Sequence, residues 1–279
     1  MELERIALRI AIQGELGSNS NMAALAMLGD VEIVACALSA EAFAQVVDGE
    51  VDGAVLPIEN SLHGSVAEHY DLLLEAPVQI VREGLLRIRH NLITMPGVRL
   101  EEIRRVISHP VALSQCRRFV AKHPEMVAMP FYDTAGAVKH LMTEQLRDVA
   151  GIAPELAAQV YGAEVLVGGI EDNAANFTRF HLVVRGDSVK SVEGDDKMSL
   201  AFAIEHRPGT LVAALERLAE AGVDLTKIES RPVPGSPWEY VFYVDVRYDA
   251  AEKAETAEAA LREHCGMVKV LGRYRAGGA

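Results

Sequence analysis

The stretch VDGAVLPIENSLHGSVAEHYDLLLE (51–75) holds a strand, a polar turn and a helix in direct succession. Its first part, VDGAVLPIE, is a short apolar run typical of a buried strand. Its last part, SVAEHYDLLLE, spaces its apolar residues as an amphipathic helix does. Strands that alternate with helices build α/β folds with mainly parallel sheets. This stretch therefore predicts an α/β protein.

The same alternation continues on both sides of this stretch. Before it stand the segments RIALRIAIQG, SNMAALAMLG, VEIVACAL and SAEAFAQVVDG; after it stand RRVISH, PVALSQCRRFVAKH, VAMPFY, TAGAVKHLMTEQ, DVAGIAP and ELAAQVYG. The segment VQIVREGLLRIRHNLITMP (78–96) interrupts the pattern with two extended runs. We expect these two runs to cross from one lobe of the protein to another.

The pattern changes after residue 185. The segment GDSVKSVEGDDK (186–197) is polar and nearly free of apolar side chains, so it is expected to be a linker. Beyond it, the segments MSLAFAIEH, GTLVAALERLAEAG, VDLTKIESRPV, WEYVFYVDVRY, AAEKAETAEAALREHC and MVKVLGRY follow the order βαββαβ. This order predicts a ferredoxin-like module over residues 198–275.

The composition narrows the class of function. The chain has 279 residues, half of them hydrophobic, and a formal net charge of −13, which argues against a nucleic-acid partner. Cys36, Cys116 and Cys265 form no CxxC pair, as expected in a reducing compartment. The N-terminal segment MELERIALRIAI carries charges where a signal peptide would be apolar, and no apolar run could span a bilayer. We therefore expect a cytoplasmic protein with no membrane partner.

Three polar clusters follow predicted strands, where ligands collect in open α/β sheets. The first is GELGSNSN (14–21), in which Ser18 or Ser20 could cap a helix that binds a carboxylate or phosphate. The second, PIENSLHGS (57–65), and the third, SHPVALSQCRR (108–118), contribute Glu59, Asn60 and Ser61, and Ser108 and His109, respectively. Each cluster taken alone also fits an ordinary capped turn.

A further polar pair opens a strand that is otherwise apolar on both faces. In EDNAANFTRFHLVVRG (171–186), Thr178 and Arg179 precede a buried run. A polar group beside a buried strand needs a partner, which is either the protein or a ligand. The sequence contains no HExxH, no metal-like Cys/His spacing, no GxSxG and no P-loop, so it does not support a metal or serine-hydrolase mechanism.

Taken together, these clusters resemble the prephenate dehydratase family. The segments that carry the resemblance are GAVLPIENSLHGSVAEHYDLL, VISHPVALSQCRRF and ELAAQVYGAEVLVGGIEDNAANFTRF. Farther on, HRPGTLVAALERLAEAGVDLTKIESRP is similar to the regulatory ACT domain of that family, with its PGxL turn and ESRP motif. The chain departs from the family pattern at Asn19 and Asn21 in the first loop and at Val111 after SHP.

The resemblance implies a fold and a division into domains. The catalytic domain is expected over 1–185, with a two-lobed fold like that of type II periplasmic binding proteins. One lobe takes about 1–80 plus 168–185 and the other about 81–167, and the active site lies in the cleft. A linker over 186–197 leads to the ACT domain over 198–275.

The resemblance also implies the reaction, in which prephenate loses CO2 and water to give phenylpyruvate, without metal or other cofactor. Thr178 would donate a hydrogen bond to the departing hydroxyl, and Arg179 would bind a carboxylate. Asn60, Ser61 and His109 are candidate neighbours in proton relay. The remaining substrate-binding candidates are Ser18, Ser20, Glu59, Ser108 and Phe180.

The ACT-like module implies control by L-phenylalanine and pairing of two modules in a homodimer or homotetramer. The candidate effector-binding residues are Pro208, Gly209, Thr210, Leu211, Glu229, Ser230, Arg231 and Pro232. Two other functions remain open. One is an arogenate dehydratase, which performs the same chemistry on an aminated side chain. The other is a non-catalytic amino-acid-binding regulator built from the same modules.

Overall fold

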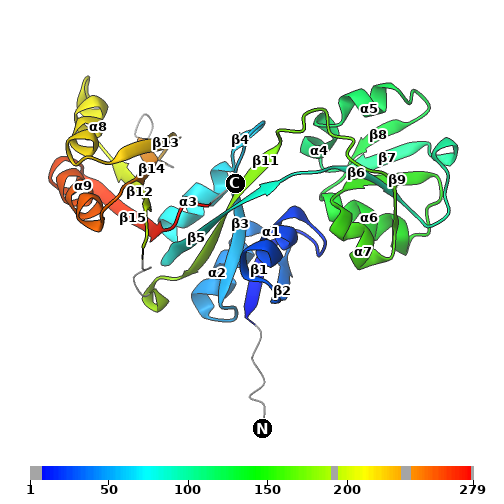
Figure 1. The fold of residues 1–279 in the computed structure, drawn as a ribbon, viewed down its shortest axis with the longest axis horizontal. Helices are drawn as coiled ribbons and strands as arrows, with labels where there is room; N and C mark the ends of the chain where they lie inside the picture. The colour runs from blue at the N-terminus through cyan, green and yellow to red at the C-terminus, as the bar shows by residue number, and fades with distance from the viewer. Residues whose placement is uncertain (1–7, 190–193, 234–239, 278–279) are drawn as a thin grey trace, which may run out of the picture. The chain divides into compact units, whose positions relative to one another are not determined.

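The computed structural model of the chain describes residues 8–189, 194–233 and 240–277 (Figure 1). It contains two compact units, the first comprising Met1–Val66 and Leu85–Phe180 and the second Ala67–Gly84 and His181–Ala279. Three predicted segments fall partly outside the described residues: the first strand, RIALRIAIQG, over 5–7, the linker over 190–193 and the strand WEYVFYVDVRY over 238–239. Within the predicted linker, Gly186–Ser188 forms the short 3-10 helix η2.

The first sheet has the strand order β2-β1-β3-β11-β5, and β4 pairs with β3. Its strands are β1 (Arg9–Gln13), β2 (Glu32–Cys36), β3 (Gly53–Asn60), β4 (Gly64–Ser65), β5 (Val78–Arg87) and β11 (Phe177–Arg185). The helices of this lobe in the first unit are α1 (Asn19–Leu28) and α2 (Ser39–Asp48). We call this part of the first unit lobe one.

Parallel pairing in lobe one brings functional loops to one edge of the sheet. Ile10 of β1 lies opposite both Ile33 of β2 and Gly53 of β3, and all three strands run in the same direction. Ile12 and Val55, a registered pair, are fully buried and help to fix that register. Because the carboxyl ends of parallel strands share an edge, the loop after β1 lies beside the end of β3.

Lobe two is built on a five-stranded sheet of order β10-β6-β9-β7-β8. Its strands are β6 (Asn91–Thr94), β7 (Arg105–Ser108), β8 (Val127–Pro130), β9 (Val149–Ala153) and β10 (Glu164–Val167). Its helices are η1 (Leu100–Glu102), α4 (Pro110–Ser114), α5 (Arg117–Ala121), α6 (Thr134–Thr143) and α7 (Glu155–Tyr161). The pairings among β7, β8 and β9 are parallel, and those of β6 with β9 and β10 are antiparallel.

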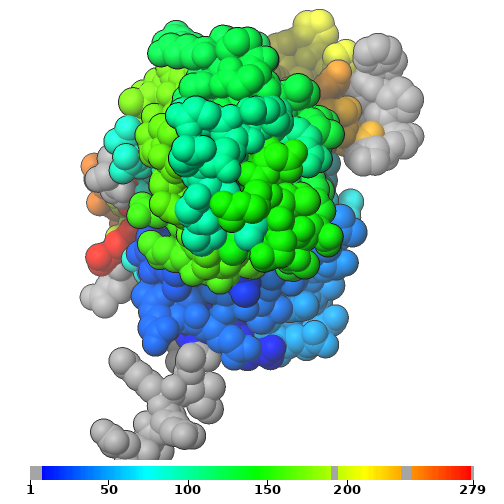
Figure 2. Space-filling model, turned by 90° about the vertical axis from the view of Figure 1, so that its right-hand side faces the viewer, coloured from blue at the N-terminus to red at the C-terminus, as the bar shows by residue number. Residues whose placement is uncertain are grey.

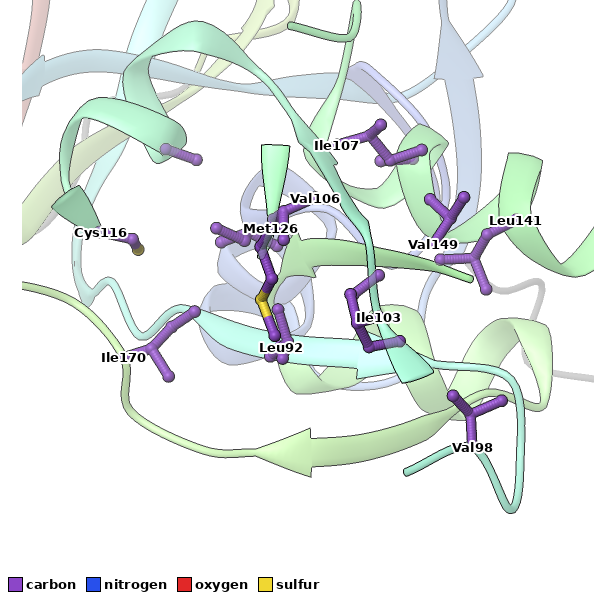
Figure 3. Close-up of a cluster of buried hydrophobic side chains, with 14 of the residues drawn as sticks. Leu92, Val98, Ile103, Val106, Ile107, Cys116, Met126, Leu141, Val149 and Ile170 are labelled. Atoms are coloured by element: carbon purple, nitrogen blue, oxygen red, sulfur yellow. The ribbon is translucent and has the colours of Figure 1, made fainter. Parts of the chain in front are cut away.

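Aliphatic side chains form the core of lobe two (Figure 3). Leu92, Ile103, Val106 and Leu141 are completely buried in it, and Figure 3 shows Leu92 and Val106 beside Met126. A fully buried side chain of this kind contributes about 1.5–3 kcal/mol relative to an exposed one. This core holds the strand ends of lobe two in place for the site described below.

The predicted helix over PVALSQCRRFVAKH is two short helices, α4 and α5, instead of one. The break falls at Gln115 and Cys116, both buried. The Gln115 side chain makes hydrogen bonds to His90, Asn176 and His63, so it points into the protein interior. Burial of these two positions, which the polar letters of the segment do not reveal, bends the chain.

The second unit contains the predicted βαββαβ order. It runs β12 (Lys197–Ala203), α8 (Thr210–Glu220), β13 (Asp224–Pro232), β14 (Tyr240–Arg247), α9 (Ala251–His264) and β15 (Met267–Tyr274). The sheet is antiparallel, with the order β13-β14-β12-β15. The predicted fold class, a two-lobed α/β domain followed by a ferredoxin-like module, is confirmed.

One face of the β12–β15 sheet carries α8 and α9, whose Ala214, Leu218 and Ala257 are fully buried or nearly so. The other face packs against α3 (Ala67–Glu75), which follows β4 in the sequence. There, the Lys269 ammonium donates to the carbonyl oxygens of Leu73, Leu74 and Ala76 at 2.7–2.9 Å. A cation at this position satisfies carbonyls that the end of a helix leaves open.

Within the described ranges, the helices are too short or too polar to cross a bilayer.

Candidate active site

A cavity of about 770 Å³ lies between the two lobes of the first unit. Lobe one contributes the loop after β1, the start of α1 and Thr178 and Phe180 of β11. Lobe two contributes His109 after β7 and the segment 132–134 after β8. Figure 2 shows the surfaces of the two lobes, with lobe two in teal and green against lobe one in blue. Strand ends from both sheets thus meet at one cavity.

Two glycines shape the loop after β1. Gly14 and Gly17 have φ of +99° and +83°, a region that glycine tolerates far better than other residues. A Cβ on Gly17 would stand 2.7 Å from Cα of Ala157 in α7, so only glycine fits this approach of the loop to lobe two. The buried Asn21 side chain closes the loop by accepting a hydrogen bond from the Gly17 N–H at 2.9 Å.

The first turn of α1 faces the cavity. Ser18 is the N-cap residue, and its hydroxyl oxygen accepts from the Asn21 N–H at 3.3 Å. The N–H groups of Asn19 and Ser20 stand in the first turn, where a helix has no carbonyl of its own to offer them. These N–H groups and the positive end of the helix can bind a carboxylate.

The Asn60 side chain, which is not part of the cavity wall, makes a hydrogen bond to Thr178, which is. The Asn60 side-chain amide donates to Oγ1 of Thr178 at 2.9 Å and to Oδ1 of Asn176 at 2.8 Å. Its own Oδ1 accepts from the N–H groups of Leu62 and His63, which fixes which end of the amide faces Thr178. Because Thr178 Oγ1 accepts from Asn60, the hydroxyl hydrogen of Thr178 is available to donate into the cavity.

A chain of amides and imidazoles supports this pair. The Asn176 amide donates to Oε1 of Gln115 at 2.9 Å, and Nε2 of the buried His90 lies 2.6 Å from the same oxygen. The Gln115 amide lies 3.0 Å from Nδ1 of His63. The network joins both lobes and holds Asn60 in one orientation.

A second set of contacts joins the lobes across the cavity. Glu15, in the loop after β1, accepts from the Tyr132 hydroxyl and from the Lys139 ammonium, both at 2.8 Å. Burial opposes ionisation of Glu15, but the hydrogen bonds of Lys139 and Tyr132 outweigh it and lower its pKa. Glu15 is therefore an ionised carboxylate at the edge of the cavity, and the Lys139 ammonium balances its charge.

Asp133 is the N-cap residue of α6, and its Oδ1 accepts from the Gly136 N–H at 2.7 Å. Burial raises the pKa of this carboxyl, and the charge of Glu15 raises it further, whereas hydrogen bonds from Gly136 and Ala135 act in the opposite direction. Asp133 lines the cavity beside the loop of Gly14.

The structure brings five of the predicted site residues to the cavity wall: Ser18, Ser20, His109, Thr178 and Phe180. Asn60 lies directly behind Thr178. The side chain of His109 caps α4 by accepting from the Val111 N–H at 3.3 Å through Nδ1. In the neutral ring, the proton then sits on Nε2. Val111, a departure from the family pattern, is thus a capping position whose side chain is partly exposed.

Four other predicted site residues lie away from the cavity wall. Arg179 donates to Oε2 of Glu59 at 2.9 Å, and neither side chain lines the cavity. Ser61 donates to the Ala175 carbonyl, and the buried Ser108 donates to the Ile152 carbonyl. Strand geometry explains the placement of Arg179, because neighbouring side chains on β11 point to opposite faces and Thr178 takes the cavity side.

Apart from His109, the sequence does not point to the residues that lobe two contributes, namely Tyr132, Asp133, Thr134, Lys139 and Tyr161, nor to Glu15 of lobe one. One signal could have found part of this set. The polar segment YDT (132–134) follows the strand VAMP with only Phe131 between them, at the strand end where ligands collect.

A family model described as prephenate dehydratase matches residues 10–188. The chain belongs to the prephenate dehydratase family. It is 40% identical over 278 residues to "Arogenate dehydratase/prephenate dehydratase 2, chloroplastic" of Arabidopsis thaliana, covering 95% of this chain and 72% of the relative.

Solved structures share the whole architecture. A prephenate dehydratase from Arthrobacter aurescens in complex with L-Phe is 32% identical, with a TM-score of 0.88, covering 96% of this chain and 90% of that one. A structure described as GqqA, a novel type of quorum quenching acylase, is 33% identical with the same TM-score, covering 96% and 98%.

Among the described residues, no three or more His, Cys, Asp or Glu side chains come together in a cluster that could hold a metal ion. The prediction that this prephenate dehydratase family member works without a cofactor stays a prediction.

The βαββαβ module of this prephenate dehydratase family member has a cavity of its own, of about 350 Å³. Four predicted effector-binding residues line it: Gly209, Thr210, Leu211 and Ser230. Aromatic walls come from Tyr240 and Phe242, and His206 and Arg207 stand at the turn before α8. The set combines apolar surface, helix-start amides and the ion pair of Arg207 with Glu205, as suits an amino acid with an apolar side chain and two charged groups.

The remaining predicted effector residues point elsewhere or stand beside the cavity. On β13, Glu229 and Arg231 lie on the opposite face of the sheet from Ser230, since neighbouring side chains alternate. Arg231 makes a two-pronged contact with Asp71 of α3, at 2.6 and 3.3 Å. Pro208 and Pro232 adjoin the lining residues without being among them.

Proposed function

We propose that this chain catalyses the decarboxylating dehydration of a cyclohexadienyl substrate, either prephenate to phenylpyruvate or arogenate to phenylalanine. The observation that carries the proposal is the Asn60–Thr178 hydrogen bond at the wall of the interlobe cavity. It leaves one preorganised O–H donor aimed at the space where the substrate would sit.

The reaction moves electrons through the ring in one direction. The C–C bond to the ring carboxylate breaks and CO2 leaves, and its electron pair enters the ring. The electron pair of the C–OH bond opposite departs with the hydroxyl, which takes a proton and leaves as water. The ring becomes aromatic, so neither an oxidant nor a reductant is needed.

Thr178 acts on the leaving hydroxyl in this proposal. Its hydroxyl is too weak an acid to give up its proton outright, so it stabilises negative charge as the C–O bond stretches. His109, whose Nδ1 accepts from the Val111 N–H, can present an Nε2–H to the same cavity. In this neutral form it can donate a second hydrogen bond to the departing oxygen, whereas full proton transfer requires the imidazolium form, in which Nδ1 no longer accepts from the Val111 N–H.

The side-chain carboxylate of the substrate would lie at the first turn of α1. The N–H groups of Asn19 and Ser20 and the Ser18 side chain stand there. Phe180, which is almost wholly buried, offers an apolar wall for the ring.

The choice between the two substrates has support on both sides. The family description names prephenate, whereas the plant relative is named for arogenate and prephenate together. An acylase function of the kind named for GqqA finds less support in the cavity. An acyl-transfer nucleophile needs a base to take its proton, but Thr178 Oγ1 receives a proton donor, the Asn60 amide.

Incubation of the purified chain with each substrate tests the proposal. Phenylpyruvate is read by its absorbance in alkali and phenylalanine by amino-acid analysis. Turnover of either supports the reaction class. If neither is converted while L-phenylalanine still binds, the chain is a non-catalytic amino-acid-binding regulator.

We also propose L-phenylalanine as an effector at the 350 Å³ cavity of the ACT-like module. Support comes from the Arthrobacter aurescens relative, which was solved in complex with L-Phe. The proposed assembly is a homodimer or homotetramer through paired modules. The proposed location is the cytoplasm, although the Arabidopsis thaliana relative is named as chloroplastic.

A further inference from the structure

The charges of the interlobe cavity distinguish between the two substrates, and this inference rests on the function proposed above. We infer that Asp133 binds the amino group of the substrate, so that the cavity favours arogenate over prephenate. The two molecules differ at one position, where arogenate carries an ammonium group and prephenate a neutral ketone.

Asp133 lines the cavity, and among the described residues it has no lysine or arginine as an ion-pair partner. Of the two carboxylates that line the cavity, Glu15 already has the Lys139 ammonium at 2.8 Å. Among the residues that the structure describes, no lysine or arginine comes within ion-pair distance of Asp133. Its partners are the N–H groups of Gly136 and Ala135 at the start of α6, and the Gly136 N–H donates at 2.7 Å.

The titratable groups around Asp133 do not replace a cation. Glu15 and Tyr161 face it from the loop after β1 and from α7, and both interact with it unfavourably when charged. Burial and the charges of Glu15 and Asp133 raise the pKa of Tyr161 to about 12, so its hydroxyl stays neutral. Among the titratable groups of the described residues that act on Asp133, His109 favours the anion, and only when its ring is protonated.

A half-buried carboxylate in this position gains from a ligand cation. Burial raises the pKa of Asp133, which means that the anion is less well stabilised here than in water. An ammonium donates N–H bonds to it and relieves that penalty. A ketone oxygen is an acceptor and would face the carboxylate with two lone pairs and no hydrogen between them.

The geometry places this carboxylate opposite the carboxylate-binding end of α1. A Cβ built on Gly14 would lie 3.0 Å from Oδ2 of Asp133 and 3.9 Å from Cβ of Ser18. Asp133 and the Ser18 cap thus adjoin the same glycine from two sides. One α-amino-acid group can therefore place its ammonium at Asp133 and its carboxylate at the Asn19 and Ser20 N–H groups.

The variant Asp133→Asn tests the inference. Asparagine caps helices as well as aspartate, so its oxygen can keep the Gly136 bond and α6 should fold. We expect wild-type kcat/KM to be at least about tenfold higher for arogenate than for prephenate. The variant should lose about 10- to 100-fold in kcat/KM for arogenate, the scale of one hydrogen bond to a charged group. Its kcat/KM for prephenate should stay level or rise.

Two further variants control this measurement. Asp133→Ser, also a strong N-cap residue, should show the same loss of preference. Asp48→Asn removes one negative charge from the end of α2, away from the cavity, and should leave the ratio unchanged. Thermal melting reports whether each variant is folded.

The outcomes distinguish failure of the proposed function from failure of the role of Asp133. No turnover of either substrate by the wild type overturns the proposed function itself. Turnover with an unchanged substrate ratio in both Asp133 variants overturns only the role of Asp133. A wild type that prefers prephenate tenfold or more also overturns it.

Discussion

Asn60 and Thr178 lie 118 residues apart in the chain, and the Asn60 amide donates to the Thr178 hydroxyl oxygen at 2.9 Å. The two strands are neighbours in the sheet, and hydrogen bonds between Ser61 and Phe177 hold the end of β3 beside the start of β11, as in an antiparallel pair. The bond fixes the direction of the Thr178 hydroxyl, because an oxygen that accepts from one side is free to donate on the other. In the proposed reaction, the orientation of the Thr178 hydroxyl thus depends on an amide that itself stands behind the cavity wall.

Replacing Thr178 tests this donor directly. Thr178→Val keeps the β-branched shape and removes the hydroxyl. We expect kcat to fall by about 10²–10³, the scale of losing one preorganised donor. KM should change less, because the first turn of α1 still binds a carboxylate. Steady-state kinetics measure both, and a folded variant with near wild-type kcat would refute the role of Thr178.

Replacing Asn60 tests the orientation alone. Asn60→Asp puts a carboxylate oxygen where the amide now donates, so Thr178 should turn its hydroxyl hydrogen toward that oxygen and away from the substrate. We expect a loss in kcat approaching that of Thr178→Val. The double variant should then be little worse than either single variant, since the two residues act as one unit. Independent, multiplying losses would argue against this coupling.

Much of the fold could be predicted from the sequence, because buried parallel strands and amphipathic helices leave regular apolar patterns. The βαββαβ order and the strand ends at Ser18, Asn60 and His109 came from those patterns. Asp133 did not, because an aspartate before a helix is also an ordinary N-cap. Arg179 was placed in the site with Thr178, although neighbours on a strand face opposite sides and only one of them can line the cavity.

Arg179 therefore gives a third kinetic prediction. Its guanidinium binds Glu59, so Arg179→Lys keeps a cation at that carboxylate. We expect KM to change by less than about threefold, because the loss of one planar guanidinium contact at a partly buried pair has a modest cost. A rise in KM of tenfold or more, with kcat unchanged, would show that Arg179 does bind substrate.

A buried ionic cluster in the second unit gives a stability prediction. The Lys197 ammonium donates to Oε2 of Glu83 at 2.6 Å, and His181 and Asp245 adjoin the pair. Glu83→Gln leaves the buried Lys197 with a weaker set of partners. We expect it to lower the free energy of unfolding by up to about 3–5 kcal/mol at neutral pH. Urea unfolding measures this, and Glu220→Gln, at an exposed ion pair, should change it by about 0.5 kcal/mol or less.

The same cluster sets a pH dependence. Burial opposes ionisation of Glu83, but hydrogen bonds and charges from His181 and Lys197 outweigh it and hold its pKa well below the usual range. A carboxyl with a lowered native pKa stabilises the fold above its unfolded pKa, which is about 4.3 for Glu, and loses that contribution as the pH falls toward the native value. The stability gap between wild type and Glu83→Gln should therefore narrow below about pH 4. A gap that stays constant down to pH 2.5 would contradict this assignment.

The effector response should depend on a contact one residue beyond the effector cavity. Ser230 lines that cavity, and Arg231, the next residue of β13, holds Asp71 of α3 at 2.6 Å. Helix α3 begins at Ala67, only seven residues after Asn60, so a shift in α3 reaches the Asn60–Thr178 pair through a short stretch of chain. A ligand shifts activity only if it binds two states unequally, and this contact is the means by which a change in β13 would alter the position of α3.

The variant Asp71→Asn tests this route. It should keep the heat of L-phenylalanine binding in calorimetry but reduce the effect of L-phenylalanine on kcat/KM. In the wild type, we expect that effect to lie within the 5- to 150-fold range of ordinary coupling, about 1–3 kcal/mol. Ser230→Leu, which fills the cavity, should abolish the binding heat, and Arg217→Gln, at an exposed pair on α8, should change neither. Full kinetic response in Asp71→Asn would exclude this route, whereas absence of both heat and response in the wild type would leave the module as an assembly element alone.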